Sequence, residues 1–309
     1  MTPRPSGARH AGRVSRTATL AAGIRAHHRR WHPDPILDDP YAVRMVSPFW
    51  RQVANNRLLN WVVVHRLLGP FHPIHTENIL RARYAEDRLA ESIGAGIRQY
   101  VILGAGLDSY TLRHPELADR VRIFEVDQPG MQALKKERVR RIHGGLPTHV
   151  TFVPIDFETD RLHEALGVAG FDPRTPAFFS WLGTTYYLTR PAIRDTLDSI
   201  AAAAAPGSRL VLDYLLARHL IPIEGLPLAD KLERLVKRLG EPMVSEFIPE
   251  ELDGELARVG FAGQDRVPPD EQARRYLQDR RDMAAPAPNF SFALYVRRNP
   301  DSGNGAALA

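Results

Sequence analysis

The sequence predicts an α/β fold in which helices cover both faces of a mostly parallel sheet. Short apolar runs alternate with helical patterns along the middle of the chain, at residues 100–103, 121–126, 150–155, 177–181 and 209–214. Strands that alternate with helices favour right-handed crossovers and a parallel sheet. Such sheets bind ligands at the carboxyl ends of their strands. Expected strand ends carry Gly104, Asp127, Asp156 and Trp181, so we expect these residues at one edge of the sheet.

The composition is that of a globular protein. The chain has 309 residues, of which 44% are hydrophobic and 25% charged, enough for one large domain or a domain with a cap. The absence of cysteine excludes disulfides, thiolate metal sites and cysteine nucleophiles, and it fits a cytoplasmic protein. The net charge of +5 is only mildly basic, whereas nucleic-acid binding usually needs a concentrated basic stripe. No apolar run is long enough to span a membrane.

The N-terminal part predicts helices that cover a later sheet. Residues 1–14 are interpreted as a solvated basic tail. Residues 15–28 offer a capping serine or threonine before a run of good helix formers. Prolines interrupt the chain after His28, and residues 50–68 are apolar on most faces. Strand alternation is absent here, so residues 15–75 are expected to form a helical lid.

Residues 76–214 are expected to form the core of the domain. The helical pattern of residues 76–93 carries Arg81 and Arg83, which are two positions apart and therefore on different faces, so only one of them is expected to point inward. Further helices are predicted over residues 132–142 and, after the capping Thr189, over residues 191–205.

After the fifth strand, the pattern indicates an insertion and then the end of the sheet. Residues 215–248 contain one helix (228–239) between proline-marked turns and are interpreted as part of the lid. Residues 249–298 contain a helix (249–259) and an alternating run (290–297) that predicts a final edge strand. Residues 299–309 are expected to be a flexible tail, which leaves one domain over residues 15–298.

The turn Gly104-Ala105-Gly106 and the acid Asp127 indicate an adenosine site. Glycine allows positive φ and close approach of a ligand, and an acid about 20 residues later, at the next strand end, typically holds ribose hydroxyls. Dinucleotide sites usually have a third glycine where this chain has Ser109, so an adenosyl ligand without a pyrophosphate is favoured over NAD. An ordinary tight turn and a helix-capping aspartate are the alternatives.

Several motifs, in consistent order from about residue 15 to 297, resemble the leucine carboxyl methyltransferase family. They are Ser15-Arg-Thr-Ala, Asp38-Asp-Pro-Tyr-Ala, Arg81-Ala-Arg-Tyr, Ile102-Leu-Gly-Ala-Gly-Leu-Asp108, Glu125-Val-Asp-Gln-Pro129, Phe179-Ser-Trp-Leu-Gly183 with Tyr187-Leu-Thr, and Pro206-Gly-Ser-Arg-Leu. More narrowly, the chain resembles the bacterial branch of S-adenosylmethionine-dependent O-methyltransferases that is found with polyketide and peptide natural products.

The resemblance implies a class I methyltransferase fold: a Rossmann-like, seven-stranded sheet whose last strand is antiparallel. It also implies that Arg81 meets the methionine carboxylate of S-adenosyl-L-methionine, that Asp127 holds the ribose, and that Asp156 and Phe157 frame the adenine. The expected cofactor-binding residues are Arg81, Gly104, Ala105, Gly106, Asp127, Gln128, Asp156, Phe157 and Trp181. Leu182 stands where phosphatase-methylating members have a glutamate, which removes a contact to the cofactor's amino group and argues against a phosphatase tail as substrate.

No catalytic residue is evident from the sequence. Methyl transfer is an in-line displacement that depends mainly on alignment. A carboxylate acceptor needs no base, whereas a hydroxyl acceptor does. His219 follows the fifth strand and is a candidate base, with a surface histidine as the alternative. Trp181, Tyr186 and Tyr187 are candidates for the cleft near the sulfonium, where aromatic faces attract a cation, but core packing explains Trp181 equally well.

The sequence therefore predicts an S-adenosylmethionine-dependent O-methyltransferase that acts on a carboxyl or hydroxyl group of a small-molecule or peptide natural product. The alternatives are an NAD-dependent oxidoreductase, which Ser109 and the lack of a Tyr-x-x-x-Lys motif disfavour, and a non-catalytic binding protein of the same fold. A metal is not expected, because the adjacent His27 and His28 point apart on a helix. The acceptor and the oligomeric state are not readable from the sequence.

Overall fold

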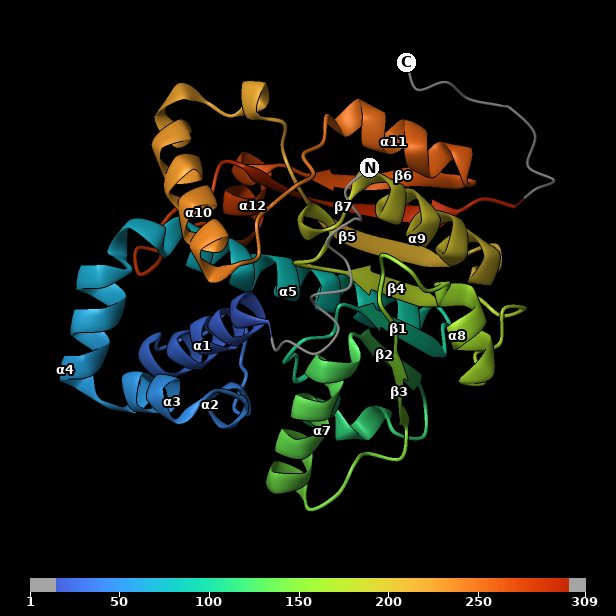
Figure 1. Ribbon diagram of the computed structural model, residues 1–309, viewed down its shortest axis with the longest axis horizontal. Helices are drawn as coiled ribbons and strands as arrows, with labels where there is room; N and C mark the ends of the chain where they lie inside the picture. Colours follow the sequence, from blue (N-terminus) through green and yellow to red (C-terminus); the bar gives the residue numbers. More distant parts are fainter. Residues whose placement is uncertain (1–14, 300–309) are drawn as a thin grey trace, which may run out of the picture.

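A seven-stranded sheet forms the centre of the structure, a computed structural model that describes residues 15–299 (Figure 1). The strands are β1 (Gln99–Leu103), β2 (Arg122–Asp127), β3 (Val150–Pro154), β4 (Phe178–Trp181), β5 (Arg209–Leu215), β6 (Phe261–Val267) and β7 (Phe290–Arg297). Their order is β3-β2-β1-β4-β5-β7-β6. Strands β1 to β5 pair in parallel, and β7 is antiparallel to both neighbours. The order reverses between β1 and β4, where such sheets bind ligands.

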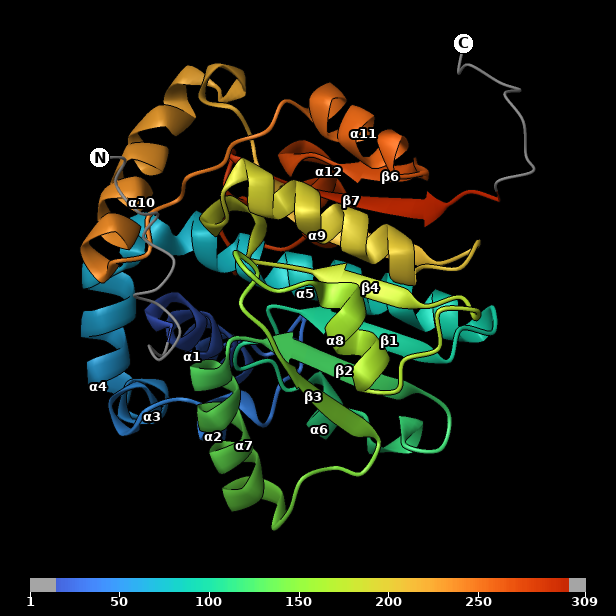
Figure 2. The same cartoon turned by 45° about the vertical axis from the view of Figure 1, so that its right-hand side comes forward.

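Helices cover both faces of this sheet (Figure 2). One face packs against α8 (Leu162–Val168), α9 (Arg190–Ala203) and α11 (Pro249–Arg258). The other face packs mainly against α5 (His72–Gly94) and α12 (Pro269–Tyr276). All five residues of β1 are buried, because a parallel sheet between two helical layers has no solvent face.

The C-terminal edge of the sheet differs from the sequence prediction. Strand β7 was expected at the edge, but it lies between β5 and β6, and β6 is the edge strand. Only Phe261 and Val267 of β6 are fully buried, while its middle residues are half-buried or exposed. An edge strand with a solvent-facing side needs few apolar residues, so the polar sequence FAGQDRV gave no strand signal.

The remaining helices gather at the carboxyl ends of the parallel strands and beside β2 and β3. The N-terminal group comprises α1 (Arg16–Trp31), α2 (Ala42–Met45), α3 (Pro48–Asn55), α4 (Arg57–Asn60) and the π-helical η2 (Trp61–Leu67). The others are α6 (Tyr110–Arg113), α7 (Pro129–His143), α10 (Leu226–Leu239) and the 3-10 turns η3 (Gly69–Phe71), η4 (Pro115–Leu117), η5 (Thr185–Tyr187), η6 (Arg218–Leu220) and η7 (Ile223–Gly225). The Ser15 side chain caps α1 by accepting from Ala18 N at 3.0 Å. The predicted tail of residues 1–14 lies outside the described residues, as does the predicted tail of residues 299–309 apart from Asn299.

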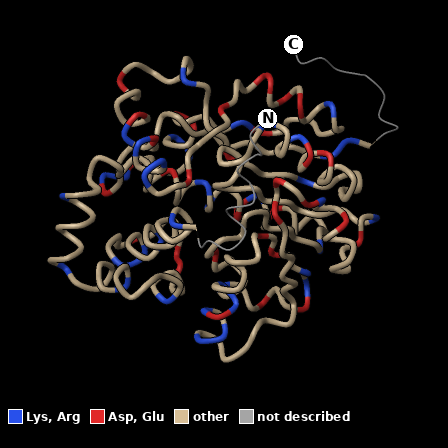
Figure 3. Tube along the Cα trace, in the orientation of Figure 1, with Lys and Arg blue, Asp and Glu red and all other residues tan. Residues whose placement is uncertain are grey.

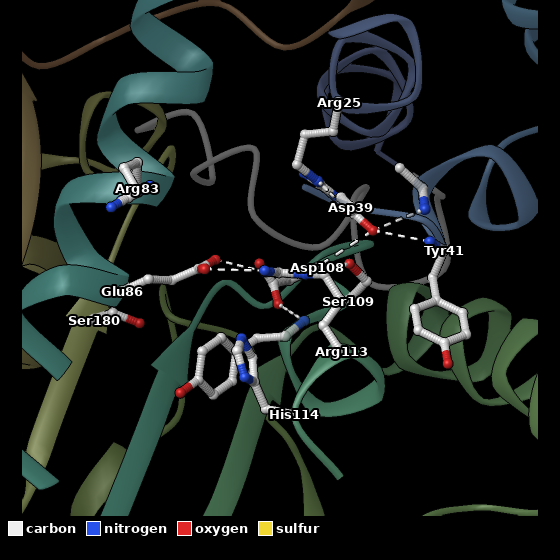
Figure 4. Close-up of polar contacts among 12 residues, drawn as sticks. Arg25, Asp39, Tyr41, Arg83, Glu86, Asp108, Ser109, Arg113, His114 and Ser180 are labelled. Atoms are coloured by element: carbon white, nitrogen blue, oxygen red, sulfur yellow. Dashed lines mark hydrogen bonds and ion pairs between the residues drawn. The ribbon is translucent and has the colours of Figure 1, made fainter. Parts of the chain in front are cut away.

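A buried ion-pair network fastens α1 to the loop after β1 (Figure 4). Arg25 donates to Asp39 Oδ2 at 2.9 Å and to the Leu107 carbonyl at 2.7 Å. Arg113 forms two hydrogen bonds with Glu86, at 2.9 and 2.5 Å. Burial acts to raise the pKa of Asp39, but the Arg25 and Arg113 guanidinium groups hold it below its usual value. Through Arg25, the network links α1 to Leu107, the residue that follows the glycine turn.

Six histidine rings form a continuous row that joins α1, η2 and α5. The row consists of His28, His32, His27, His65, His72 and His75, whose successive ring centroids are 4.6 to 6.0 Å apart. Burial and neighbouring imidazoles lower the pKa of His27 to about 3 and that of His75 to about 4. Burial likewise lowers the pKa of His28 to about 3. Within residues 15–299, no group of acidic or histidine side chains has metal-binding geometry.

Acidic and basic residues are interspersed along α7 and α11, whereas α1, α3, α4 and η2 carry arginines and no acidic residue (Figure 3). On α7, for example, Arg141 pairs with Glu137 one turn earlier. Among the described residues, no helix has the length and apolarity needed to cross a membrane.

Candidate active site

A cavity of about 890 Å³ lies at the carboxyl ends of β1, β2 and β4. Its floor is formed by the strand ends and the loops that follow them. Its walls are α1, α10 and the N-terminal half of α5, and Figure 2 shows α1 and α10 on that side of the sheet. The predicted residues Arg81, Gly104, Ala105, Gly106, Asp127, Gln128, Asp156, Phe157, Tyr186 and Tyr187 all line it. The structure thus brings together most of the candidates that the sequence suggested.

The glycine turn and Asp127 are in direct contact. Gly106 N donates to Asp127 Oδ2 at 2.5 Å, and Gln128 N donates to Oδ1 at 2.7 Å. The turn is also fastened to β2, because the Gly104 and Ala105 amides both donate to the Val126 carbonyl. Burial raises the pKa of Asp127, although these two backbone donors oppose the shift. Each carboxylate oxygen retains a lone pair for a further donor.

Gly104 has to be glycine for two reasons. Its φ of +68° lies in the left-handed region, and a Cβ on it would meet Thr184 Oγ1 at 2.1 Å. Because Gly104 has no side chain, the turn can pack against the loop after β4 on one side and face the cavity on the other.

Asp156 and Phe157 follow β3 and close one end of the cavity. Asp156 organises its own loop, since its N–H donates to Asp160 Oδ2 at 2.8 Å and its Oδ1 accepts from Glu158 N at 3.0 Å. Asp156 therefore does not cap α8, whose N-cap is Arg161, and its role in the loop is compatible with ligand binding because it also lines the cavity. The buried ring of Phe157 supplies an apolar wall.

Only one of the two arginines of α5 points inward, as their spacing predicted, and it is Arg81. Arg81 Nη1 donates to the Tyr186 hydroxyl at 2.9 Å and to Asp213 Oδ2 at 3.1 Å. Arg83 instead pairs with Asp87 on the outer face of the helix. Every hydrogen bond that the described residues make to Arg81 uses Nη1, so Nε and Nη2 are available to an anion in the cavity.

Glu77 and Asn78 line the same cavity and escaped the sequence prediction. Glu77 Oε1 lies 3.5 Å from Arg81 Nη1, too long for a good hydrogen bond, and both this oxygen and Asn78 Oδ1 are buried without a hydrogen-bond partner among the described residues. Burial raises the pKa of Glu77 to about 8, although Arg81 opposes the shift. The spacing of Glu77 one helical turn before Arg81 was an available signal.

Asp213 was also missed, although it is an acid near the end of the apolar strand β5. It is fully buried behind Arg81, accepts from Gly183 N through Oδ1 at 2.6 Å and pairs with Arg81 through Oδ2. A Cβ on Gly183 would lie 2.7 Å from Arg81 Nη2, so the turn after β4 and the guanidinium fit closely. Asp213 therefore positions Arg81.

Two predicted residues lie outside the cavity. Trp181 has no exposed surface and belongs to the core beneath the sheet, where its ring stacks at 6.5 Å on Phe157, so it supports the cavity wall and does not line it. Successive side chains of a strand point to opposite faces of the sheet. Trp181 therefore points into the core, and the next residue, Leu182, reaches the cavity. His219 is exposed in η6 and does not line the cavity, which argues against the predicted base.

The two tyrosines do line the cavity, but their protonation makes them poor bases. Burial raises the pKa of Tyr186 and of Tyr187 well above the ordinary tyrosine value. Both phenols are therefore neutral near pH 7, and Tyr186 already accepts from Arg81. Their aromatic faces remain available to shape the cavity beside Leu232 and Val236 of α10.

The carboxylate of Glu241 joins two parts of the cavity wall, the start of α1 and the segment after α10. Glu241, just after α10, accepts hydrogen bonds from the amides of Arg16 and Thr17, at 2.7 and 3.2 Å, and from the hydroxyls of Ser15 and Thr17. Negative charge at a helix N-terminus is stabilised by the free amides there. We refer to these contacts between Glu241 and the start of α1 as the Glu241 clasp.

Comparison with known proteins gives the family. The model of the leucine carboxyl methyltransferase family matches residues 18–201. A Bacillus subtilis (strain 168) protein named "Putative S-adenosyl-L-methionine-dependent methyltransferase YktD" is 31% identical over 293 residues, which cover 87% of this chain and 93% of that protein. A Mycobacterium sp. (strain JLS) protein with the same functional name is 36% identical over 216 residues, 66% of this chain and 67% of the relative.

Solved structures support the fold. The chain resembles a "putative methyltransferase" from Thermobifida fusca YX with a TM-score of 0.58 and 18% identity, covering 97% of this chain and 100% of that one. A DUF574 family protein from Streptomyces avermitilis MA-4680 also has a TM-score of 0.58, at 13% identity and with 93% and 98% covered. The predicted class I methyltransferase fold and the family resemblance are thereby confirmed. The chain belongs to the leucine carboxyl methyltransferase family, a family of S-adenosyl-L-methionine-dependent methyltransferases.

Proposed function

We propose that the protein is an O-methyltransferase that uses S-adenosyl-L-methionine to methylate a carboxyl or hydroxyl group of a small-molecule or peptide natural product. The observation that carries this proposal is the convergence of the Gly106–Asp127 contact and of Arg81 on one cavity. The names of the relatives support the cofactor, and the description of the matched family supports oxygen as the accepting atom.

The residues that line the cavity fit the ribose and the amino-acid part of S-adenosyl-L-methionine. Asp127 has free lone pairs for ribose hydroxyls, Gly104 offers a backbone without a Cβ, and Arg81 has free donors for a carboxylate. Asp156 and Phe157 bound the end of the cavity where the adenine would lie. When bound, the cofactor supplies a methyl group on a positively charged sulfur. The protein's own contribution is to fix the positions of donor and acceptor, and good alignment is worth about 7–11 kcal/mol.

The rest of the cavity fits an apolar acceptor. Its walls there include Ile74, Tyr187 and Phe290, together with the inner face of α10. We infer that the helical lid of residues 15–75 and the insertion of residues 215–248 shape the acceptor site. Leu182 lines the cavity at the position where the phosphatase-methylating members of the family have a glutamate. This difference supports an acceptor other than a phosphatase tail. The absence of cysteine supports a cytoplasmic location.

Isothermal titration calorimetry with S-adenosylmethionine tests the cofactor, and saturable binding is expected. A radiolabelled methyl donor with pools of carboxylic acids, phenols and alcohols then tests the acceptor. Methyl esters release methanol in alkali and methyl ethers do not, so the two oxygen acceptors are distinguishable. Saturable binding of NADH without binding of S-adenosylmethionine would support the oxidoreductase instead, and cofactor binding without transfer to any acceptor would support a binding protein.

A further inference from the structure

Glu77 is a buried acid whose role the cofactor site leaves open. Its side chain is 2% exposed, it lines the cavity between Ile74 on the acceptor side and Arg81 on the cofactor side, and its Oε1 has no hydrogen-bond partner in the described chain. A buried polar atom without a partner costs free energy unless a ligand satisfies it. The position indicates that a bound molecule supplies the missing donor.

The charges around Glu77 do not balance within the protein. Its charged or titratable neighbours are Arg81 on the same helix, Asp213 on β5 and Tyr186 on η5. Asp213 is already satisfied by Arg81 and Gly183 N, and Tyr186 is neutral. Glu77 and Asp213 therefore share the positive charge of Arg81. Since Asp213 already pairs with Arg81, Glu77 needs either a proton or a cation from the cavity.

We propose that Glu77 is the general base of the methyl transfer, and that the reacting group of the acceptor is a hydroxyl. The inference rests on the proposed function and specifies its acceptor. In the transfer, the acceptor oxygen forms a bond to the methyl carbon, and the carbon–sulfur bond breaks with its electron pair on sulfur. The hydroxyl proton passes to Glu77 Oε1.

This step conserves charge inside the cavity. The sulfonium loses its positive charge in the same event in which Glu77 loses its negative charge, so no net charge is created in a buried site. A carboxylate acceptor has no proton to give, and it would bring a second negative charge next to an ionised Glu77. A hydroxyl acceptor therefore fits the site better than a carboxylate.

Proton release on cofactor binding tests the inference without catalysis. Calorimetry at pH 7 in phosphate and in Tris, which differ in ionisation enthalpy, measures the protons released. S-adenosylmethionine, whose sulfonium favours ionised Glu77, is expected to release several tenths of a proton more than S-adenosylhomocysteine. Glu77→Gln should abolish the difference. The control Glu91→Gln removes an exposed acid from the same helix and should preserve it.

The outcomes separate the two proposals. Failure of S-adenosylmethionine to bind would refute the proposed function, whereas binding with equal proton release for both ligands, or a difference that survives in Glu77→Gln, would refute the role of Glu77. Glutamine has the shape of the neutral acid and is expected to fold, which thermal unfolding checks. Glu77→Asp provides a second variant that keeps the carboxyl group.

Product analysis provides the catalytic test. Labelled product from the hydroxyl pool should resist alkali, and Glu77→Gln should lower its kcat by about 100-fold or more, since general bases contribute 10²–10⁴-fold. The KM for S-adenosylmethionine should change less than threefold, and Glu77→Asp should restore part of the rate. The wild-type rate should rise with pH as Glu77 ionises, and Glu77→Gln should lose this dependence. Exclusively alkali-labile product, made at an undiminished rate by Glu77→Gln, would overturn the inference.

Discussion

Replacing Asp127 by asparagine should weaken cofactor binding by about 10- to 150-fold. The carboxylate accepts from Gly106 N and Gln128 N, one bond to each oxygen, and its remaining lone pairs face the cavity. Asparagine keeps one acceptor oxygen and turns an NH₂ group toward one of these two amides. The loss of a hydrogen bond to a charged group costs about 1.5–3 kcal/mol, which corresponds to the stated range.

Calorimetry with S-adenosylhomocysteine measures this change directly. The exposed Asp119, which lies outside the cavity, provides the control variant Asp119→Asn with the same loss of charge. Thermal unfolding without ligand shows whether Asp127→Asn keeps its fold. A dissociation constant within twofold of wild type, in a variant that unfolds normally, would refute the assignment of Asp127 to the ribose.

Three further substitutions test the surroundings of the cavity. Gly104→Ala should lower the free energy of unfolding by at least about 1–2 kcal/mol in urea titrations, because alanine is strained at positive φ, and adding Thr184→Ala should recover the steric part. Trp181→Phe should reduce stability by about 0.5–3 kcal/mol and leave cofactor affinity within twofold, and a larger loss of affinity would return Trp181 to the site. Glu241→Ala should speed dissociation of S-adenosylhomocysteine at least fivefold in stopped-flow experiments, and an unchanged rate would show that the Glu241 clasp does not gate the cavity.

Helices and strands whose own residues form a clear pattern could be predicted from the sequence. The apolar runs gave β1 to β5 and β7, and capping residues gave the starts of α1 and α9, where Ser15 and Thr189 accept as expected. The glycine turn and Asp127 were predictable as a pair because parallel strand ends meet at one edge. Helical spacing predicted that only one of Arg81 and Arg83 would point inward, and the family resemblance indicated that it would be Arg81.

What remained hidden depends on contacts between distant segments. The edge strand β6 has little apolar sequence, and its strand conformation comes from pairing with β7. The roles of Glu77 and Asp213 arise only where α5 meets the end of β5, about 130 residues later in the chain. Trp181 ends an apolar strand at the correct edge, but its side chain points to the opposite face, and only the register of β4 decides that.

The row of imidazoles makes the packing of α1, η2 and α5 sensitive to acid. An unfolded histidine binds a proton near pH 6.5, whereas His27, His28 and His75 do so only near pH 3 to 4 in the folded protein. Stability is therefore fully present above pH 6.5 and falls as the pH drops, by about 2 kcal/mol per histidine at pH 5. Three such losses approach the whole stability of an ordinary domain, about 5–15 kcal/mol. These histidines belong to α1 and α5, which also supply walls of the cavity, so acidification is expected to loosen this side of the cavity.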